Sequence, residues 1–385
     1  MSSEGDAALA GDAHRVEDAG TDAGPPADLD GFIEHQMRAG GIPGVAAAIV
    51  SDGELAWVGT YGYADIESER LVEPHTLFIM ASISKTLAAA RAMQLVEAGQ
   101  LDLDAPVETY LGHPMRHPGY PELPITTRML LTHTSGLEDA WLRLGAVSTN
   151  GSDPTVTLAA FTEGYVTPGG AYYSDANWGA QPGTRRSYCN AAFGVVGAVL
   201  EAAGDASLRE QSEAAIFGAL DMDGAGWFLE DIDLARVATP YAWSGRRFLP
   251  QEQSGMAFYP AGSLRVSVTG LARFLLAIDG GGALDGARIL TEESVTETLR
   301  IQFPDIASYQ ALTWSRRRVA GHLYIGHSGS TSGGSTQMLL SEEGTHGIIL
   351  LTNSDAYLRT RFGFEEGDRA MEAILERLDA EALAL

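Results

Sequence analysis

Apolar residues recur at helical spacing near both ends of the chain. Leu29, Phe32, Ile33 and Met37 occupy positions i, i+3, i+4 and i+8, and a glycine pair follows at 40–41. This pattern predicts an amphipathic helix that ends at the glycines. A second amphipathic helix is predicted close to the C-terminus, with an apolar face made of Ala370, Met371, Ile374, Leu375 and Leu378.

Short apolar runs separated by turn residues predict strands beside these helices. The runs 45–50 and 55–63 are separated by Asp52-Gly53, and Asp-Gly between two such runs favours a β-hairpin. Three further strand-like runs follow near the other end of the chain, at 322–325, 335–340 and 347–351. Hairpin-connected strands with helices at both termini predict the α/β (α+β) class, with an antiparallel sheet flanked by helices.

The middle of the chain predicts a mostly helical second lobe over residues 101–255. Residues 191–204 form an apolar run interrupted by glycines, which favours a buried helix. Residues 138–181 place aromatic side chains among glycines and prolines, and we expect them to form a long irregular wall of a cleft. The sheet lobe is then expected at about 28–100 and 256–385, within one domain that covers 28–385.

The first 27 residues have a different composition. They are rich in Asp, Ala and Gly, end near Pro25-Pro26 and predict a disordered acidic tail. They lack the basic region and apolar stretch of a signal peptide, and no apolar run in the chain approaches the roughly 18 residues that span a bilayer. We therefore expect a cytoplasmic protein. The single cysteine, Cys189, excludes an intramolecular disulfide.

The charge of the chain limits its partners. There are 51 acidic and 25 basic residues, which gives a net charge of −26. Such a surface repels the phosphates of nucleic acids and anionic membranes, so we expect a small-molecule partner instead. The charge also suggests a halophilic protein, because concentrated salt screens the repulsion between like charges. The alternative is a generally acidic, arginine-rich proteome.

A salt-adapted chain should be more stable in salt than in dilute buffer. We expect the melting temperature to rise between about 0.05 M and about 2 M KCl, because the screening length falls from above 10 Å to below 3 Å. Thermal unfolding followed by circular dichroism measures the change. A melting temperature that stays constant or falls over this range contradicts salt adaptation.

One lysine stands alone among the 25 basic residues. Lys85 follows Ser82 by three positions, and residues at i and i+3 of a helix share a face. A buried lysine can lose its proton and act as a base, whereas arginine stays protonated. Ser82 and Lys85 are therefore candidates for a nucleophile and its base. The alternative is a surface lysine that happens to follow a serine.

Two further segments offer the other groups that acyl transfer needs. Tyr188 could shuttle a proton near a cationic lysine, and Asn190 offers an amide donor and acceptor to a substrate. The segment 326–334 combines glycines and serines between strand-like runs, so its backbone could approach a ligand and help to form an oxyanion hole. Taken singly, these segments are better explained by a packed tyrosine and by a turn without a role.

The three segments in this order resemble the penicillin-binding-protein and class C β-lactamase group of serine hydrolases, with its esterase and D-aminopeptidase relatives. The resemblance covers roughly residues 29–380. It extends to three further segments, namely Gly41-Ile42-Pro43-Gly44, residues 125–137 and residues 260–264. It implies a β-lactamase/transpeptidase-like fold without a cofactor or metal.

The resemblance also implies a role for each matching residue. Ser82 would be the acylated nucleophile, and Lys85 and Tyr188 would be the acid/base pair, with either one as the base. Asn190 would contact the acyl side of the substrate. The backbone N–H groups of Ser82 and Ser330 would hold the oxyanion.

Two positions depart from the family pattern. His327-Ser328-Gly329 stands where the family has Lys-Thr-Gly, and His327 and Gly329 would line the substrate site. The family's lysine helps to hold a substrate carboxylate, whereas a histidine is only partly charged near neutral pH. We therefore expect esters or small amides as substrates; a β-lactamase, D-Ala carboxypeptidase or D-aminopeptidase is the alternative. Cys189 replaces a common serine, a small change.

Other classes of protein fit the sequence less well. Gly-x-Ser-x-Gly, the nucleophile motif of α/β-hydrolases, does not occur, and neither does the zinc motif His-Glu-x-x-His. A non-catalytic, penicillin-recognising sensor remains an alternative from a different class. Such relatives usually lose a catalytic residue, whereas this chain keeps the serine, the lysine and the tyrosine.

Overall fold

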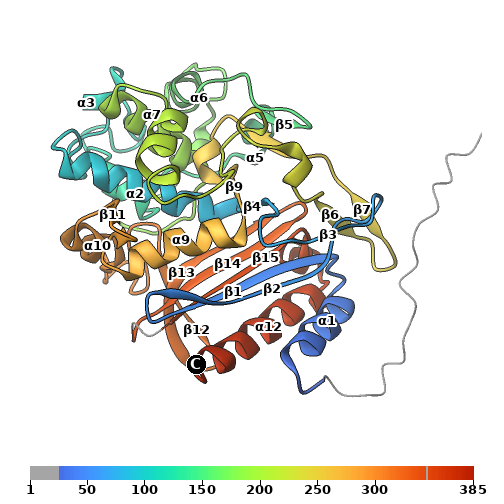
Figure 1. Ribbon diagram of the computed structural model, residues 1–385. Helices are drawn as coiled ribbons and strands as arrows, with labels where there is room; N and C mark the ends of the chain where they lie inside the picture. Colours follow the sequence, from blue (N-terminus) through green and yellow to red (C-terminus); the bar gives the residue numbers. More distant parts are fainter. Residues whose placement is uncertain (1–25, 344–345) are drawn as a thin grey trace, which may run out of the picture.

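The computed structural model describes residues 26–343 and 346–385. Its centre is a seven-stranded sheet in which every neighbouring pair is antiparallel, in the order β12-β13-β14-β15-β1-β2-β3 (Figure 1). In that order the strands are β12 (Ser315–Val319), β13 (His322–Thr331), β14 (Gly334–Ser341), β15 (His346–Thr352), β1 (Gly44–Ser51), β2 (Glu54–Asp65) and β3 (Arg70–Leu71).

The central strand β1 shows why the sheet needs helices on both faces. Seven of its eight residues are buried. Val45, Ala47 and Ile49 belong to one apolar core, whereas Ala46 and the other alternate residues belong to the second. This alternation follows from the two-residue period of a strand. The β1–β2 hairpin turns through Asp52 and Gly53, both with positive φ, as Asp-Gly predicted.

Helices cover the sheet in two layers (Figure 1). α1 and α12 pack on each other and on one face, while α9 packs on the other face, where most of the remaining helices lie. The helices are α1 (Leu29–Gly40), α2 (Ser84–Glu97), α3 (Glu108–Leu111), α4 (Thr127–Leu131), α5 (Trp141–Gly145), α6 (Leu158–Val166), α7 (Ala191–Gly204), α8 (Leu208–Ser212), α9 (Val268–Asp279), α10 (Glu292–Leu299), α11 (Ala356–Arg359) and α12 (Glu366–Ala382).

Four two-stranded pairs supplement the main sheet. They are β4 (Phe78–Ile79) with β9 (Arg265–Val266), β5 (Ser148–Asn150) with β8 (Ser254–Met256), β6 (Tyr241–Trp243) with β7 (Phe248–Pro250), and β10 (Ala283–Leu284) with β11 (Ala287–Arg288). The helix α2 contacts α7 as well as α10, so it lies where the two predicted lobes meet. The division into these lobes at residues 101 and 255 stays a prediction.

The helix α7 is buried over its first ten residues, as its apolar run predicted. Among the described residues, no single helix has the length and apolarity needed to cross a bilayer. Only α7 combined with residues 208–217, at a bend of 77°, meets those criteria.

The structure confirms the predicted fold class, the two terminal helices and the first hairpin. It corrects three details. β13 continues to Thr331, because glycines and serines pair with β14 as well as apolar residues do. The sequence analysis did not predict β12, because three consecutive arginines replace the alternation of apolar and polar residues that is typical of a strand. Residues 138–181 are not irregular throughout, since α6 packs Phe161 and Tyr165 into the core. The predicted tail at 1–27 lies almost wholly outside the described residues.

Candidate active site

The backbone places Ser82 at the start of a helix. It lies in a short 3-10 helix, η1 (Ala81–Ile83), which leads directly into α2. Ala81 has a φ of +46°, a strained value for a residue with a side chain, and such strain is found mostly at functional sites. The first N–H groups of a helix have no partner within it, so the Ser82 N–H is free to bind an oxyanion.

Lys85 is fully buried, and three oxygen atoms surround its amine. Nζ lies 3.0 Å from Ser82 Oγ, 2.9 Å from Asn190 Oδ1 and 2.6 Å from the Ala261 carbonyl oxygen. The amide and carbonyl oxygens can only accept hydrogen bonds. In the ammonium form the third N–H group donates to Ser82 Oγ. In the neutral form two N–H groups suffice for the amide and carbonyl oxygens, and the lone pair can accept from the Ser82 hydroxyl.

Burial lowers the pKa of Lys85 from its usual 10.5 to about 7, while the nearby carboxylate of Asp139 acts in the opposite direction. Removing an ammonium group from water disfavours its charged form. The neutral amine is therefore available near neutral pH. This is the form that can take a proton from Ser82.

Asp139 holds the other side of this arrangement. Its Oδ2 accepts a hydrogen bond of 2.7 Å from Asn190 Nδ2, and its Oδ1 accepts from the N–H groups of Asn190 (2.7 Å) and Ala191 (2.9 Å). The carboxylate thus caps the first turn of α7. Because the Asp139 carboxylate accepts from Nδ2 of Asn190, the Oδ1 of the same amide faces Lys85. The predicted contact between Asn190 and the substrate stays a prediction.

Tyr188 completes the group around the nucleophile. Its hydroxyl shares a hydrogen bond with Ser82, and Lys85 Nζ lies 5.0 Å from the ring centroid. Although 37% of the residue surface is exposed, burial of the phenol raises the pKa of Tyr188 well above its usual value of 10. Tyr188 therefore keeps its proton over the pH range in which Lys85 loses one of its own.

The ring of His133 packs against the ring of Tyr188. The two ring centroids are 4.3 Å apart, and His133 Nδ1 lies 3.2 Å from the Cys189 N–H, which donates to it. His133 is buried, and burial lowers its pKa well below 6.5, so the ring is neutral. It packs against Tyr188 without adding charge. Sequence reasoning gave this residue no role.

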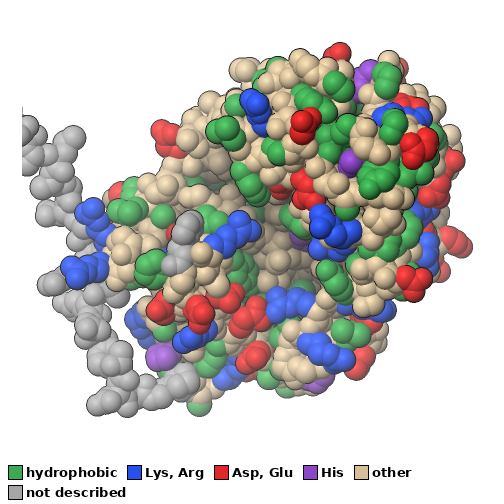
Figure 2. Space-filling model, turned by 180° about the vertical axis from the view of Figure 1, so that it is seen from behind, with side chains coloured by type: hydrophobic (Ala, Val, Ile, Leu, Met, Phe, Trp, Pro, Cys, Tyr) green, Lys and Arg blue, Asp and Glu red, His purple; other side chains and the backbone are tan. Residues whose placement is uncertain are grey.

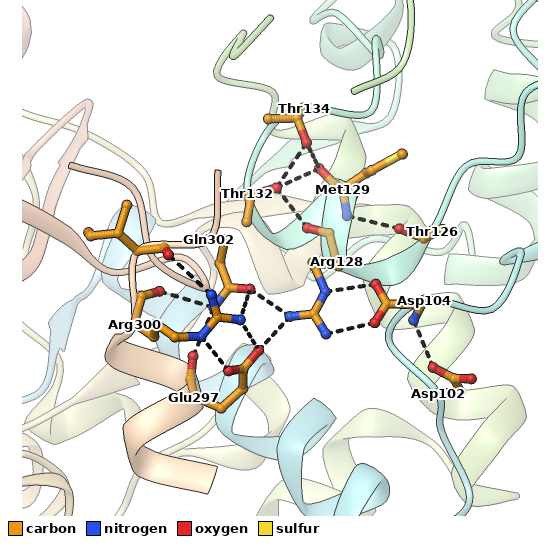
Figure 3. Close-up of polar contacts among 11 residues, drawn as sticks. Asp102, Asp104, Thr126, Arg128, Met129, Thr132, Thr134, Glu297, Arg300 and Gln302 are labelled. Carbon is orange, nitrogen blue, oxygen red and sulfur yellow. Dashed lines mark hydrogen bonds and ion pairs between the residues drawn. The ribbon is translucent and has the colours of Figure 1, made fainter. Parts of the chain in front are cut away.

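An ionic network anchors the helix that precedes His133 (Figure 3). Arg128, in α4, donates to both carboxylate oxygens of Asp104 at 2.7 and 2.8 Å. Its Nη1 donates to Glu297 and Gln302, each at 2.6 Å, and Arg300 also binds Glu297. Bidentate arginine–carboxylate pairs fix geometry as well as charge. The network therefore ties α4 to α10, and α4 ends two residues before His133, whose ring packs on Tyr188.

The strand β13 presents open backbone groups to the site. The Glu342 N–H donates to the Leu323 carbonyl at 3.0 Å, so odd-numbered residues of β13 bond to β14 and even-numbered residues point to the opposite edge. β12 covers that edge only as far as Gly326. Beyond it, the N–H groups of Ser328 and Ser330 point to an uncovered edge. This orientation suits the predicted oxyanion role of Ser330.

Gly329 allows this strand to approach the nucleophile. A Cβ at Gly329 would lie 2.3 Å from the Met80 carbonyl oxygen and 3.1 Å from the Ala81 Cβ. Contacts under 3.0 Å with backbone atoms are not tolerated without movement of the chain. Glycine is thus required here for close approach and not for a special φ.

His327 is buried and uncharged. Its Nδ1 lies 2.6 Å from the Ser328 carbonyl oxygen, which can only accept, so Nδ1 carries the proton and Nε2 is an acceptor. Burial, with a contribution from the charge of Lys85, lowers the pKa of His327 from 6.5 to about 3. The sequence predicted a partly charged histidine at this position; the structure makes the positive charge weaker still.

The surface is hollowed near the middle of the molecule in the view of Figure 2, and Lys and Arg side chains lie around this hollow. Among residues 26–343 and 346–385, no group of three or more His, Cys, Asp or Glu side chains is placed to hold a metal ion. The groups that the structure brings together around Ser82 are its hydroxyl, the amine of Lys85 and the phenol of Tyr188.

Comparison with family models identifies the protein family of this chain. Residues 29–363 match the family model described as Beta-lactamase. The chain belongs to the beta-lactamase family. This membership confirms the resemblance to the class C β-lactamase and penicillin-binding-protein group of serine hydrolases.

Two curated proteins are similar to part of the chain. Esterase EstB of Burkholderia gladioli is 32% identical over 220 residues, which cover 56% of this chain and 54% of EstB. The mitochondrial serine beta-lactamase-like protein LACTB of Homo sapiens is 38% identical over 104 residues, which cover 25% of this chain and 18% of LACTB. The match thus spans about half of one relative and less than a fifth of the other.

Solved structures of beta-lactamase-fold proteins match nearly the whole chain. The octameric penicillin-binding protein homologue from Pyrococcus abyssi has a TM-score of 0.68 at 25% identity, covering 87% of this chain and 77% of that one. D-amino acid amidase from Ochrobactrum anthropi SV3, complexed with D-phenylalanine, has a TM-score of 0.71 at 21% identity, covering 92% and 100%. These likenesses establish the fold.

The structure thus brings the predicted Ser82, Lys85, Tyr188 and Asn190 into one cluster, with His327 and the open edge of β13 beside it. Sequence reasoning missed Asp139 and His133. The only signal for them was their position in or directly after the family-like segment 125–137.

Proposed function

We propose that this beta-lactamase-family protein is a serine hydrolase that works through an acyl-enzyme on Ser82. The observation that carries the proposal is the fully buried amine of Lys85, 3.0 Å from the Ser82 hydroxyl and held by two acceptors on its other sides. A serine hydroxyl is a weak nucleophile until a base accepts its proton. A structural lysine would instead be expected to have a carboxylate partner.

In the acylation step, neutral Lys85 takes the proton from Ser82 Oγ as that oxygen attacks the substrate carbonyl carbon. The N–H groups of Ser82 and Ser330 stabilise the negative charge on the carbonyl oxygen. When the bond to the leaving group breaks, Tyr188 donates its proton to the departing oxygen or nitrogen. The proton on Lys85 then returns to the Tyr188 oxygen.

In the deacylation step, a water molecule replaces the leaving group. Neutral Lys85 takes a proton from this water as the water oxygen attacks the acyl carbon, and the proton passes to Ser82 Oγ when the ester bond to the enzyme breaks. The carboxylic acid leaves, and the starting protonation state is restored. Lys85 and Tyr188 titrate as a coupled pair, so kinetic pKa values belong to the pair.

We assign esters or small amides as the substrate class. The similarity to an esterase supports this class, as does the neutral His327, which cannot form an ion pair with a β-lactam carboxylate. A β-lactamase or D-peptidase activity is the second candidate, since Arg186 lies 5.8 Å from the ring centroid of Tyr188 and supplies a permanent charge on that side.

Covalent labelling combined with turnover tests the proposal. We expect a fluorophosphonate probe to add one label to the pure protein, which peptide mass spectrometry locates at Ser82. We also expect hydrolysis of short-chain p-nitrophenyl esters to exceed that of nitrocefin. A protein that takes up no label and hydrolyses no ester favours the non-catalytic sensor, whereas nitrocefin turnover well above ester turnover reverses the substrate ranking.

A further inference from the structure

A rigidly held guanidinium stands beside the candidate acid/base pair. Arg186 precedes Tyr188 by two residues, and its Nε donates to Gln310 Oε1 at 2.7 Å. Its guanidinium carbon lies 5.8 Å from the Tyr188 ring centroid and 5.3 Å from that of Tyr309, so the group sits between two aromatic rings. These contacts orient the fork but use only one of its N–H groups.

The charge of Arg186 is not balanced within the described residues. The preceding Arg185, which is exposed, forms an ion pair of 3.0 Å with Glu138. Arg186 is half-buried, yet among residues 26–343 and 346–385 it has no carboxylate partner, although the chain carries 51 acidic residues. A half-buried guanidinium with free N–H groups and no anion beside it is suited to receive one from outside.

The rest of the site cannot supply that charge. The ring of His327 also lies near Tyr188, with the ring centroids 6.3 Å apart, but its Nδ1 donates to the Ser328 carbonyl and its Nε2 can only accept. Lys85 serves the nucleophile and has no free N–H group. A chain of net charge −26 repels anions unless a local positive group offsets the repulsion. Arg186 is placed to do so.

We propose that Arg186 binds a carboxylate on the leaving-group side of the substrate and so selects acidic leaving groups. The inference rests on the proposed function, because it takes Tyr188 as the donor of the leaving-group proton. Arg186 packs on the ring of Tyr188, and the hydroxyl of that ring bonds to Ser82. A leaving group that receives the Tyr188 proton extends along this ring towards the guanidinium. Two parallel hydrogen bonds then fix the carboxylate.

A matched pair of esters tests this assignment. 3-Acetoxybenzoate and its methyl ester share the scissile acetyl ester and differ in the charge on the leaving group. We expect the wild type to prefer 3-acetoxybenzoate in kcat/KM. We expect Arg186→Gln to lower that preference about 10- to 100-fold, mainly through KM, because a charge-assisted bidentate contact is lost. Arg186→Lys should retain part of the preference, since it keeps the charge but not the fork.

The control is Arg185→Gln, which removes the adjacent exposed charge and should leave the preference between the two esters within about twofold of wild type. A second substrate pair, p-nitrophenyl hemisuccinate and p-nitrophenyl butyrate, places the charge on the acyl side. If Arg186→Gln changes the preference between the charged and neutral substrates only in this second pair, Arg186 does not bind a carboxylate on the leaving-group side.

Equal effects of Arg186→Gln on the charged and neutral leaving groups, or none on either, overturn the inference as a whole. If Ser82 takes up the fluorophosphonate but the wild type shows no preference for the charged leaving group, the inference about Arg186 fails while the proposed hydrolase stands. An unlabelled protein without ester turnover counts against both.

Discussion

Replacing Ser82 by alanine is expected to abolish ester hydrolysis while the fold persists. Removal of a serine nucleophile typically lowers kcat about 10⁴-fold or more, because no other group can form the acyl-enzyme. The side chain of Ser82 is only partly buried, and its loss creates no large cavity. Ester turnover, fluorophosphonate labelling and the melting temperature are measured on the same preparation.

The matched control for this change is Ser152→Ala, which removes the hydroxyl of an exposed loop serine. It should keep both turnover and labelling. Residual activity of Ser82→Ala above about one hundredth of wild type would show that the serine is not the nucleophile, because a catalytic serine contributes much more than that. A large fall in melting temperature would instead indicate a structural role.

Replacing Lys85 by arginine is expected to lower kcat/KM by about 10²- to 10⁴-fold, the usual contribution of a general base. The positive charge is kept, but a guanidinium cannot accept the Ser82 proton. The burial of Lys85 also predicts the pH dependence. Because its pKa is lowered to about 7, the base is neutral above this pH and protonated below it. The kcat/KM of the wild type should therefore rise with pH up to about 7 and then level off.

Arg91→Lys provides the comparison on the same helix. Arg91 lies in α2, six residues after Lys85, and donates hydrogen bonds to Gln94 and Gln211. The exchange therefore alters a partly buried cation on the same helix. It should keep the turnover and the pH profile of the wild type. A profile that stays flat from pH 5 to about 9, or an active Lys85→Arg variant, would contradict the role of Lys85 as base.

The local part of the site could be read from the sequence because it depends on spacing. Ser82 and Lys85 are three positions apart at the start of a helix, and helix geometry alone brings such residues together. The same is true of the terminal helices and the first hairpin, whose periods of 3.6 and 2 residues are visible in the chain. The sequence analysis did not predict β12 because its pattern is polar, and it did not predict α6 because the glycine and the aromatic residues of this helix resemble those of a loop.

The electrostatic part of the site depends on contacts between distant segments. Asp139 orients Asn190 from 51 positions away, and the Ala261 carbonyl meets Lys85 from 176 positions away. No spacing rule connects these residues. The pKa of Lys85 is lowered because the folded chain buries its amine, and the amino-acid type alone does not determine this value.

The sequence by itself therefore determined the family, the fold class and the closeness of Ser82 to Lys85, because these follow from local periodicity and from ordered motifs. Only the tertiary structure decided which groups carry charge. Burial lowers the pKa of Lys85 to about 7 and leaves His327 uncharged, while the guanidinium of Arg186 lies near the rings of Tyr188 and Tyr309. The free energy of ionisation depends on solvent exclusion and on neighbours from the whole chain, and that information exists only once the chain has folded.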